Sequence, residues 1–83
     1  MEETKHFVLR LRQRGISYEQ AAFVYAYGIT RPAHGKKFKV IMNQQAYAQA
    51  YHEVNDKKFL KKCLNIVLIA SHNNRFVTAY YSK

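Results

Sequence analysis

An uninterrupted apolar run, Ile-Val-Leu-Ile-Ala at residues 66–70, is the feature that most restricts the fold of this chain. Successive side chains of a strand point to opposite faces, so a strand that is apolar at every position is buried on both faces. We therefore predict a central strand here. Residues 72–75, His-Asn-Asn-Arg, predict a turn, because asparagine tolerates a positive φ better than other residues with a side chain.

Residues 76–81 are predicted to return as a second strand after that turn. Regular alternation would divide this strand between two faces. One face would carry Phe76, Thr78 and Tyr80, and the other Val77, Ala79 and Tyr81.

Two helices are predicted before the first strand. The first covers residues 4–14 and ends at Gly15, which adopts the left-handed conformation at little cost. Ser17 opens the second helix and forms a capping box with Gln20, in which each side chain accepts from the other residue's backbone N–H. Gly28 ends this helix, so the two helices form an αα-hairpin.

The middle of the chain alternates between strand and helix patterns. A short strand is expected at residues 29–31, before a turn at Pro32 and Gly35. Residues 36–42 then alternate, which predicts a half-buried strand with a basic outer face. Its inner positions are Phe38, Val40 and Met42, and its outer positions are Lys37, Lys39 and Ile41.

A helical segment follows this strand. Asn43 can cap a helix that Asn55 and Asp56 interrupt, and Asp56 can cap a further short helix that continues to Leu64. The complete order, α-α-β-α-β-β, predicts one α+β domain over residues 1–83. In this domain the N-terminal αα-hairpin packs on a small antiparallel sheet of about three or four strands, with a further helical segment between strands.

The charge of the chain is strongly one-sided. It has 14 Lys and Arg against 5 Asp and Glu, for a net charge of +9. Beyond Glu19 the only carboxylates are Glu53 and Asp56. Such a field attracts polyanions or an acidic protein partner and speeds their encounter.

Cys63 is the single cysteine, so no internal disulfide is expected, and no zinc-ligand spacing accompanies it. We expect a buried thiol in a reducing cytoplasm. No apolar run approaches the roughly 18 residues that span a bilayer, and residues 1–5 lack the apolar region of a signal peptide. The expected protein is cytoplasmic and has no membrane partner.

His6, Arg10 and Arg14 recur at every fourth position of the first predicted helix, at about 0°, 40° and 80° around its axis. Phe7 and Leu11 follow at about 100° and 140°, so the three cationic groups line the edge of the apolar stripe. One imidazole and two guanidiniums at this edge can face a phosphate group. Alternatively, the arginines lay their aliphatic stems along apolar surface and keep their charged ends in water.

The segment HFVLRLRQRGIS at residues 6–17 resembles the opening signature H-A-x-x-R-M-x-x-R-G-I-S of a small bacterial domain of unknown function, grouped with RelE-like and BrnT-like toxins. Residues 66–71 and 77–80 resemble that family's final hairpin, V-V-V-S-x-D-G-x-I-V-T-V-Y. The family's acidic-glycine turn is replaced here by residues 72–75, and the helix after Asp56 is unusually rich in lysine. Both departures favour contact with a polyanion.

The resemblance implies the toxin of a toxin–antitoxin system, a metal-independent endoribonuclease that acts on RNA and has an acidic antitoxin as its partner. In such chemistry the RNA 2′-hydroxyl attacks the adjacent phosphorus, and the enzyme supplies a proton acceptor, a proton donor and cations. His6 is the candidate acid or base, and Arg10 and Arg14 are candidate phosphate ligands. Thr78 and Tyr80, which match the family's last strand, could complete the site. No cofactor or metal is expected, because the chain has few carboxylates and no metal-ligand spacing.

Several further cations are candidates for contact with a nucleic-acid backbone, although such residues also commonly form a solvated face. They are Lys37, Lys39, Lys57, Lys58, Lys61, Lys62 and Arg75. Two other functions stay open. One is a nucleic-acid-binding module without catalysis, and the other is an interaction domain for an acidic protein.

Overall fold

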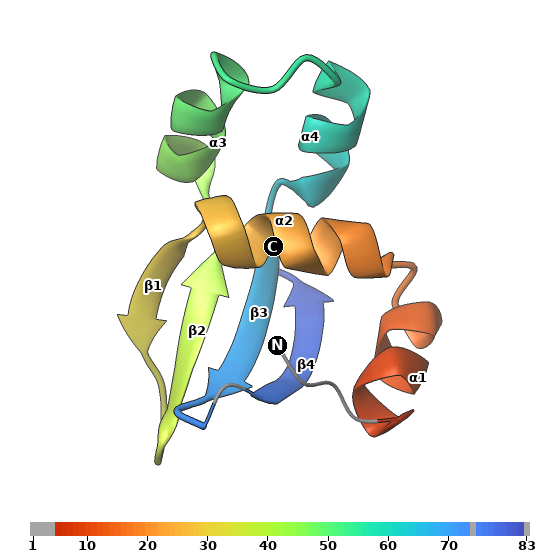
Figure 1. Ribbon diagram of the computed structural model, residues 1–83, viewed down its shortest axis with the longest axis vertical. Coiled ribbons are helices and arrows are strands. Elements are labelled where there is room, and N and C mark those ends of the chain that lie inside the picture. Colours follow the sequence, from red (N-terminus) through yellow and green to blue (C-terminus); the bar gives the residue numbers. More distant parts are fainter. Residues whose placement is uncertain (1–4, 74, 83) are drawn as a thin grey trace.

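The computed structural model describes residues 5–73 and 75–82, the side chains of residues 5 and 6 excepted. These residues form four helices and four strands in the order ααββααββ (Figure 1). The helices are α1 (Lys5–Gln13), α2 (Tyr18–Tyr27), α3 (Gln44–Tyr51) and α4 (Lys57–Cys63). The strands are β1 (Ile29–Pro32), β2 (Lys37–Ile41), β3 (Ile66–Ser71) and β4 (Arg75–Tyr81). The predicted α+β class, with its N-terminal αα-hairpin and its helical segment between strands, is confirmed. The predicted order α-α-β-α-β-β differs from the structure because it omits the short strand β1 and counts α3 and α4 as one helical segment.

The strands form one antiparallel sheet in the order β1-β2-β3-β4. β3 lies between β2 and β4, so the prediction of a central strand is confirmed. Helices α3 and α4 lie beyond one end of the strands, which we call the helical end (Figure 1). The β1–β2 and β3–β4 turns lie at the opposite end, which we call the turn end.

Local signals build the αα-hairpin as predicted. Gly15 has a φ of +70°, a conformation that glycine adopts without strain. Ser17 Oγ accepts from the backbone N–H of Gln20 at 3.1 Å, and Gln20 Oε1 accepts from the backbone N–H of Ser17 at 2.7 Å. The capping box is therefore complete, and it satisfies two backbone donors at the start of α2.

Gly28 stands at the end of α2, where the helix comes very close to β2. A Cβ atom at this position would lie 2.7 Å from the Val24 carbonyl oxygen and 2.7 Å from Val40 Cγ1. Only a residue without a side chain lets the end of α2 come this near to β2.

The helical segment between β2 and β3 also follows its capping residues. Asn43 Oδ1 accepts from the Ala46 backbone N–H at 2.9 Å, and Asp56 Oδ1 accepts from the Phe59 backbone N–H at 3.0 Å. The predicted interruption is confirmed, since α3 ends at Tyr51 and α4 begins after Asp56.

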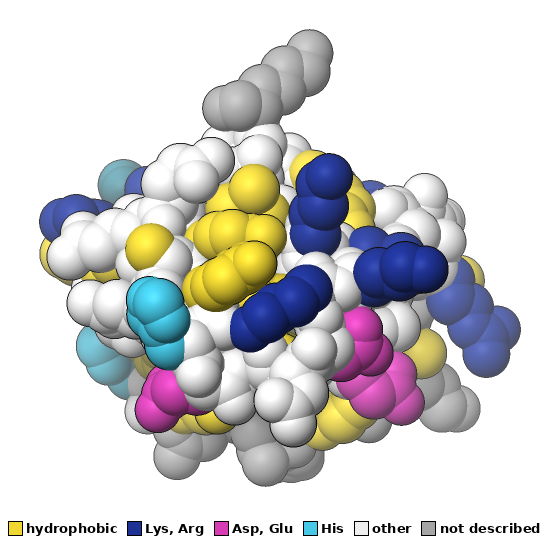
Figure 2. All heavy atoms as spheres, turned by 90° about the horizontal axis from the view of Figure 1, so that it is seen from above, with side chains coloured by type: hydrophobic (Ala, Val, Ile, Leu, Met, Phe, Trp, Pro, Cys, Tyr) yellow, Lys and Arg dark blue, Asp and Glu magenta, His cyan; other side chains and the backbone are white. Residues whose placement is uncertain are grey.

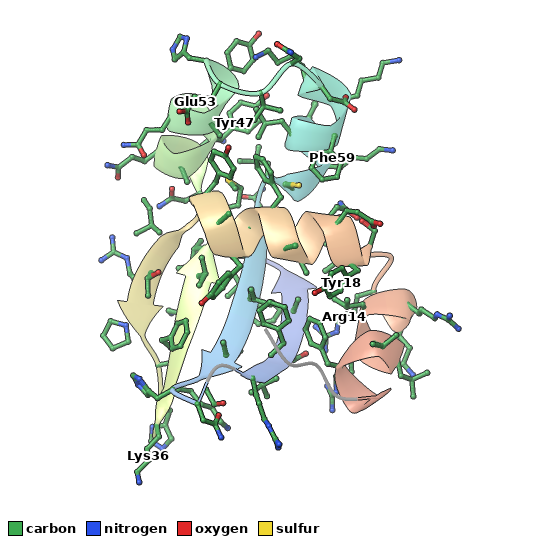
Figure 3. All side chains as sticks on the ribbon, viewed as in Figure 1. Arg14, Tyr18, Lys36, Tyr47, Glu53 and Phe59 are labelled. Atoms are coloured by element: carbon green, nitrogen blue, oxygen red, sulfur yellow. The ribbon has the colours of Figure 1, made fainter. Side chains whose placement is uncertain are left out.

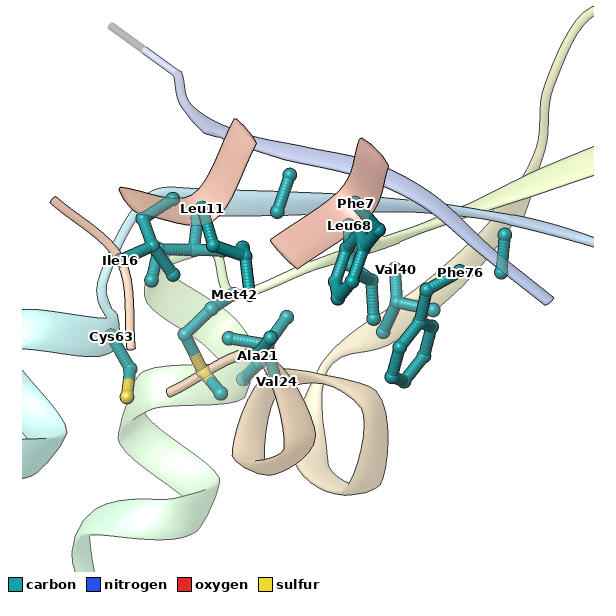
Figure 4. Packing of buried hydrophobic residues seen from close by; sticks show 14 residues of the cluster. Phe7, Leu11, Ile16, Ala21, Val24, Val40, Met42, Cys63, Leu68 and Phe76 are labelled. Carbon is teal, nitrogen blue, oxygen red and sulfur yellow. The ribbon is translucent and has the colours of Figure 1, made fainter. Parts of the chain in front are cut away.

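Helix α2 lies across one face of the sheet, which we call the first face, and α1 packs beside β4 (Figure 1). The rings of Phe7 on α1 and Phe76 on β4 lie 5.0 Å apart, a contact that ties this helix to the last strand. The core between the helices and the first face is seen in Figure 4. Its buried members are Phe7, Leu11, Ile16, Ala21, Val24, Val40, Met42, Ala46, Cys63, Ile66, Leu68, Ala70, Phe76 and Ala79.

The predicted alternation along β4 is wrong at one position. Ile69 pairs with Thr78 but Ala70 pairs with Phe76, so Val77 is an extra residue in the strand and forms a β-bulge. The bulge shifts the alternation, and Phe76 faces the core together with Ala79 rather than sharing a face with Thr78. Thr78 and Tyr80 remain together on the other face of the sheet.

The buried side chain of Gln20 connects α2 with α4 and β4. Gln20 is 6% exposed, and its Nε2 donates to the Lys62 carbonyl at 3.0 Å and to the Tyr81 hydroxyl at 3.3 Å. Tyr81 donates in turn to the same carbonyl at 3.2 Å.

Cys63 is a free, buried thiol, as predicted, and burial raises its pKa from 9.0 to about 11.

Candidate nucleic-acid interface

The face of the sheet opposite α2, which we call the second face, is defined by the strand register. Lys39 pairs with Arg31 on one side and with Ile69 on the other, and Ile69 pairs with Thr78. Directly paired residues share a face, so these four side chains form a row across the sheet. A neighbouring row contains Ile41, Val67 and Tyr80.

A third row lies at the turn end and contains Lys37, Ser71 and Arg75. Lys37 and Arg75 are exposed, and Lys39 in the adjacent row is half-buried. The register therefore brings together three of the cations that the sequence predicted for contact with nucleic acid. Ser71 of β3 lies between Lys37 and Arg75, and the apolar Ile69 of β3 lies next to Lys39.

Two further cations of this end were missed by the sequence analysis. Arg31 belongs to the row of Lys39, and Lys36 lies in the β1–β2 turn; both are exposed. Figure 3 shows Lys36 at the turn end and the carboxylate Glu53 at the opposite, helical end. Because the sequence has no Asp or Glu at residues 20–52 or 57–83, no carboxylate of these segments neutralises the turn end. The one feature of the sequence that could have indicated a cation here is the adjacent pair Lys36 and Lys37 beside a predicted turn.

Arg14 directly follows α1 and lies at the edge of the second face. Arg14 Cζ lies 5.8 Å from the centroid of the Tyr80 ring, within the range of a cation–π contact. Figure 3 shows Arg14 between α1 and the sheet. Thr78 shares the face of Tyr80, and its buried Oγ1 has no hydrogen-bond partner in the described part of the chain. The structure thus gathers three of the predicted site residues where α1 packs against β4.

The other two predicted site residues lie on α1. Arg10 is half-buried, and its carbonyl accepts from the Arg14 backbone N–H at 3.2 Å, so the two arginines are one helical turn apart. The His6 side chain lies outside the described residues. A role for His6 therefore stays a prediction.

The lysines of α4 lie at the helical end, away from the second face (Figure 1). They are Lys57, Lys58, Lys61 and Lys62, and all four are exposed. Figure 2 looks onto this end and shows basic side chains beside a central hydrophobic patch. The structure therefore divides the predicted nucleic-acid contacts between two ends of the molecule.

Lys57 differs from the other lysines of α4 because it is held locally. Its Nζ lies 4.1 Å from the centroid of the Tyr51 ring and donates to the carbonyls of Tyr51 and Val54. These contacts hold the chain between α3 and α4, which gives Lys57 a structural role.

Within residues 5–73 and 75–82, no three histidine, cysteine or carboxylate side chains gather in an arrangement that could hold a metal ion. None of the helices in the same residues has the length and apolar character needed to cross a membrane.

Comparisons of the chain with protein-family models, with curated proteins and with solved structures found no match. The resemblance of residues 6–17 and 66–80 to RelE-like and BrnT-like toxins stays a prediction from the sequence.

Proposed function

We propose that this chain binds single-stranded RNA along the second face of its sheet. The observation that carries the proposal is the cross-strand arrangement of Arg31, Lys37, Lys39 and Arg75 beside the β3 residues Ile69 and Ser71. Neighbouring strands lie about 4.8 Å apart, so one flexible polyanion meets several of these cations at once. Release of the counterions of the RNA then favours binding.

A single strand suits this face better than a duplex. Ile41, Ile69 and Tyr80 are half-buried on the second face, so part of each side chain is open to a ligand. Aromatic and apolar side chains contact bases when the bases are unpaired and unstacked, whereas duplex RNA is bound mainly through its shape and backbone.

Two charge-matched double variants test the proposal through fluorescence anisotropy of a labelled RNA at several salt concentrations. Lys37→Gln with Lys39→Gln removes two charges from the second face, and Lys58→Gln with Lys61→Gln removes two from the helical end. We expect the first pair to weaken binding roughly tenfold and to lower the slope of log affinity against log salt by about 1.4. The second pair should change both quantities much less. Equal losses in the two variants would show that net charge alone attracts RNA, and would reject the second face as the site.

A second function, metal-independent cleavage of the bound RNA, is favoured by the contact between Arg14 and Tyr80. A guanidinium that lies over a ring keeps the N–H donors at its edge for a phosphate group. In the reaction the 2′-oxygen bonds to phosphorus and loses its proton, while the bond to the 5′-oxygen breaks and that oxygen gains a proton. Arg14 would stabilise the charge on phosphorus, and Tyr80 and His6 are the candidates for proton transfer. The proposed toxin role, with an acidic antitoxin as partner, belongs to this second function.

Incubation of the folded protein with RNA in the presence of a chelator tests the cleavage. We expect products with 2′,3′-cyclic phosphate and 5′-hydroxyl ends, and we expect Arg14→Ala to abolish them without a large loss of thermal stability. If RNA stays intact in wild-type samples, with and without ribosomes, while binding persists, the chain is a binding module without catalysis.

A further inference from the structure

A shallow pocket opens at the turn end of the first face, between the β1–β2 hairpin and the β3–β4 turn. It has a volume of about 330 Å³ and is lined by Thr30, Arg31, Pro32, Phe38 and His72. A second pocket of about 360 Å³ adjoins it and is lined by Lys36, Ser71, His72 and Asn73. His72 lines both pockets, so the two are adjacent, and we refer to the pair as the depression.

The floor of the first pocket is made of flat, apolar groups. Pro32 and Phe38 are directly paired across β1 and β2, which places the two rings side by side. The His72 ring lies 5.6 Å from the Phe38 ring at an interplanar angle of 59°. Phe38 is half-buried and His72 is exposed, so ring surface remains open to a ligand.

Hydrogen bonds between backbone groups hold this floor in place. The His72 backbone N–H donates to the Lys36 carbonyl at 3.2 Å, which joins the two turns. The Ala33 backbone N–H donates to the Lys37 carbonyl at 3.1 Å, which closes the β1–β2 turn. The pocket is therefore formed before any ligand binds.

Charge complements the apolar floor. Arg31 is among the residues that line the first pocket and Lys36 among those that line the second, so each pocket has one cationic residue in its lining. Neither pocket is lined by a carboxylate among the described residues. Aromatic surface with cations at its border fits a ligand that has both a flat ring and a negative charge.

We propose that this depression binds one nucleotide, with the base against Phe38, Pro32 and His72 and the phosphate beside Lys36 or Arg31. Each pocket has a volume at the lower end of the range of small-molecule sites, about 300–1,000 Å³. For a nucleotide that is part of RNA, the inference rests on the proposed function. Arg31 connects the two surfaces, because it also belongs to the row of Lys39 on the second face. An RNA strand held on the second face can therefore pass around the turn end and insert a base.

An abasic RNA of about six nucleotides, compared with the same length of uridylate or adenylate, separates base contact from backbone contact. Anisotropy competition measures both ligands. We expect the base-containing RNA to bind roughly tenfold more tightly. His72→Ala should remove that difference, and His34→Ala should keep it, because His34 is an exposed histidine of the neighbouring turn that lines neither pocket. Phe38→Leu, checked by thermal unfolding, tests the floor separately.

Free nucleoside monophosphates supply the second arm, measured by NMR shifts of the His72 ring protons in wild-type protein and by calorimetry in the variants. Binding of a free nucleotide that His72→Ala abolishes supports the pocket even if RNA does not bind, in which case the proposed function fails and the nucleotide site stands. If abasic and base-containing RNA bind equally and free nucleotides do not bind, the pocket proposal is overturned, while RNA binding on the second face stands. Binding of an acidic aromatic peptide, with no response to either nucleotide ligand, would likewise overturn it.

Discussion

The Arg14 guanidinium lies 5.8 Å from the Tyr80 ring on the second face of the sheet, while Phe7 of the preceding helix α1 meets Phe76 at 5.0 Å on the first face. Helix α1 and the residue that follows it therefore contact both sides of β4. β4 is an edge strand, because β3 is its single neighbour in the sheet order. Helix α1 lies beside it, and covering an edge in this way protects the strand from pairing with another chain.

A substitution of Tyr80 should separate RNA binding from RNA cleavage, the two functions proposed for this surface. Tyr80→Phe keeps the ring under Arg14, so we expect RNA affinity within about twofold of wild type. If Tyr80 transfers a proton, the same change should lower cleavage by at least about 100-fold. Anisotropy and a cleavage assay at several pH values measure the two effects. Unchanged cleavage by Tyr80→Phe would exclude the hydroxyl from the chemistry.

Gln20→Leu should destabilise the fold by about 2–3 kcal/mol. The change removes one half of the capping box and the amide that donates to the Lys62 carbonyl and the Tyr81 hydroxyl. Urea unfolding measures the loss. Gln45→Leu, at an exposed position of α3, is the matched control and should change stability by less than about 0.5 kcal/mol. A loss no larger than that of the control would mean that the network around Gln20 contributes little.

Gly28→Ala should cost more than Gly35→Ala. At Gly28 the new Cβ would meet the Val24 carbonyl oxygen at 2.7 Å and the Ile41 carbonyl oxygen at 3.0 Å, so backbone has to move. We expect a loss of about 2–3 kcal/mol there. Gly35 has a φ of +72° and nothing within 4 Å of its Cβ position, so Gly35→Ala adds backbone strain alone, about 1 kcal/mol. Thermal or urea unfolding of both variants gives the order, and the reverse order would contradict the close approach of α2 to β2.

Burial raises the pKa of the Cys63 thiol from 9.0 to about 11, which predicts a specific dependence of stability on pH. Between these two values the unfolded thiol loses its proton while the folded thiol keeps it, so the contribution of this group falls as pH rises from 9 to 11. Cys63→Ala should show a smaller fall over the same range when the two proteins are unfolded with urea in parallel. Native Cys63 should also react slowly with iodoacetamide at pH 8 and rapidly in urea. Equal reaction rates in the two states would show that the thiol is accessible in the folded protein.

The elements that depend on local signals could be predicted from the sequence. Gly15, Ser17, Asn43 and Asp56 act through hydrogen bonds or φ values within a few residues, and each marks a helix boundary in the structure. The central position of β3 also followed from its own composition, because only a covered strand tolerates apolar residues at every position.

Features that depend on contacts between distant residues could not be predicted. The bulge at Val77 arises from the pairing of β4 with β3, and no residue type in residues 76–81 signals it. The gathering of Arg31 with Lys39, and of Lys37 with Arg75, requires the register of the strands. The contact of Arg14 with the last strand was expected from a family resemblance rather than from spacing, since spacing says nothing about which strand a helix packs against.

Because Val77 is an extra residue, the side chains of β4 alternate between the two faces differently before and after it. Before Val77, the Phe76 side chain points into the core and contacts Phe7 of α1. After Val77, the Thr78 and Tyr80 side chains point to the second face. Deletion of Val77 would impose one regular alternation of side chains on the whole strand. Either Phe76 would leave the core, or Thr78 and Tyr80 would turn from Arg14 toward α2. The bulge therefore allows Phe76 to contact α1 in the core while Tyr80 of the same strand contacts Arg14 on the second face.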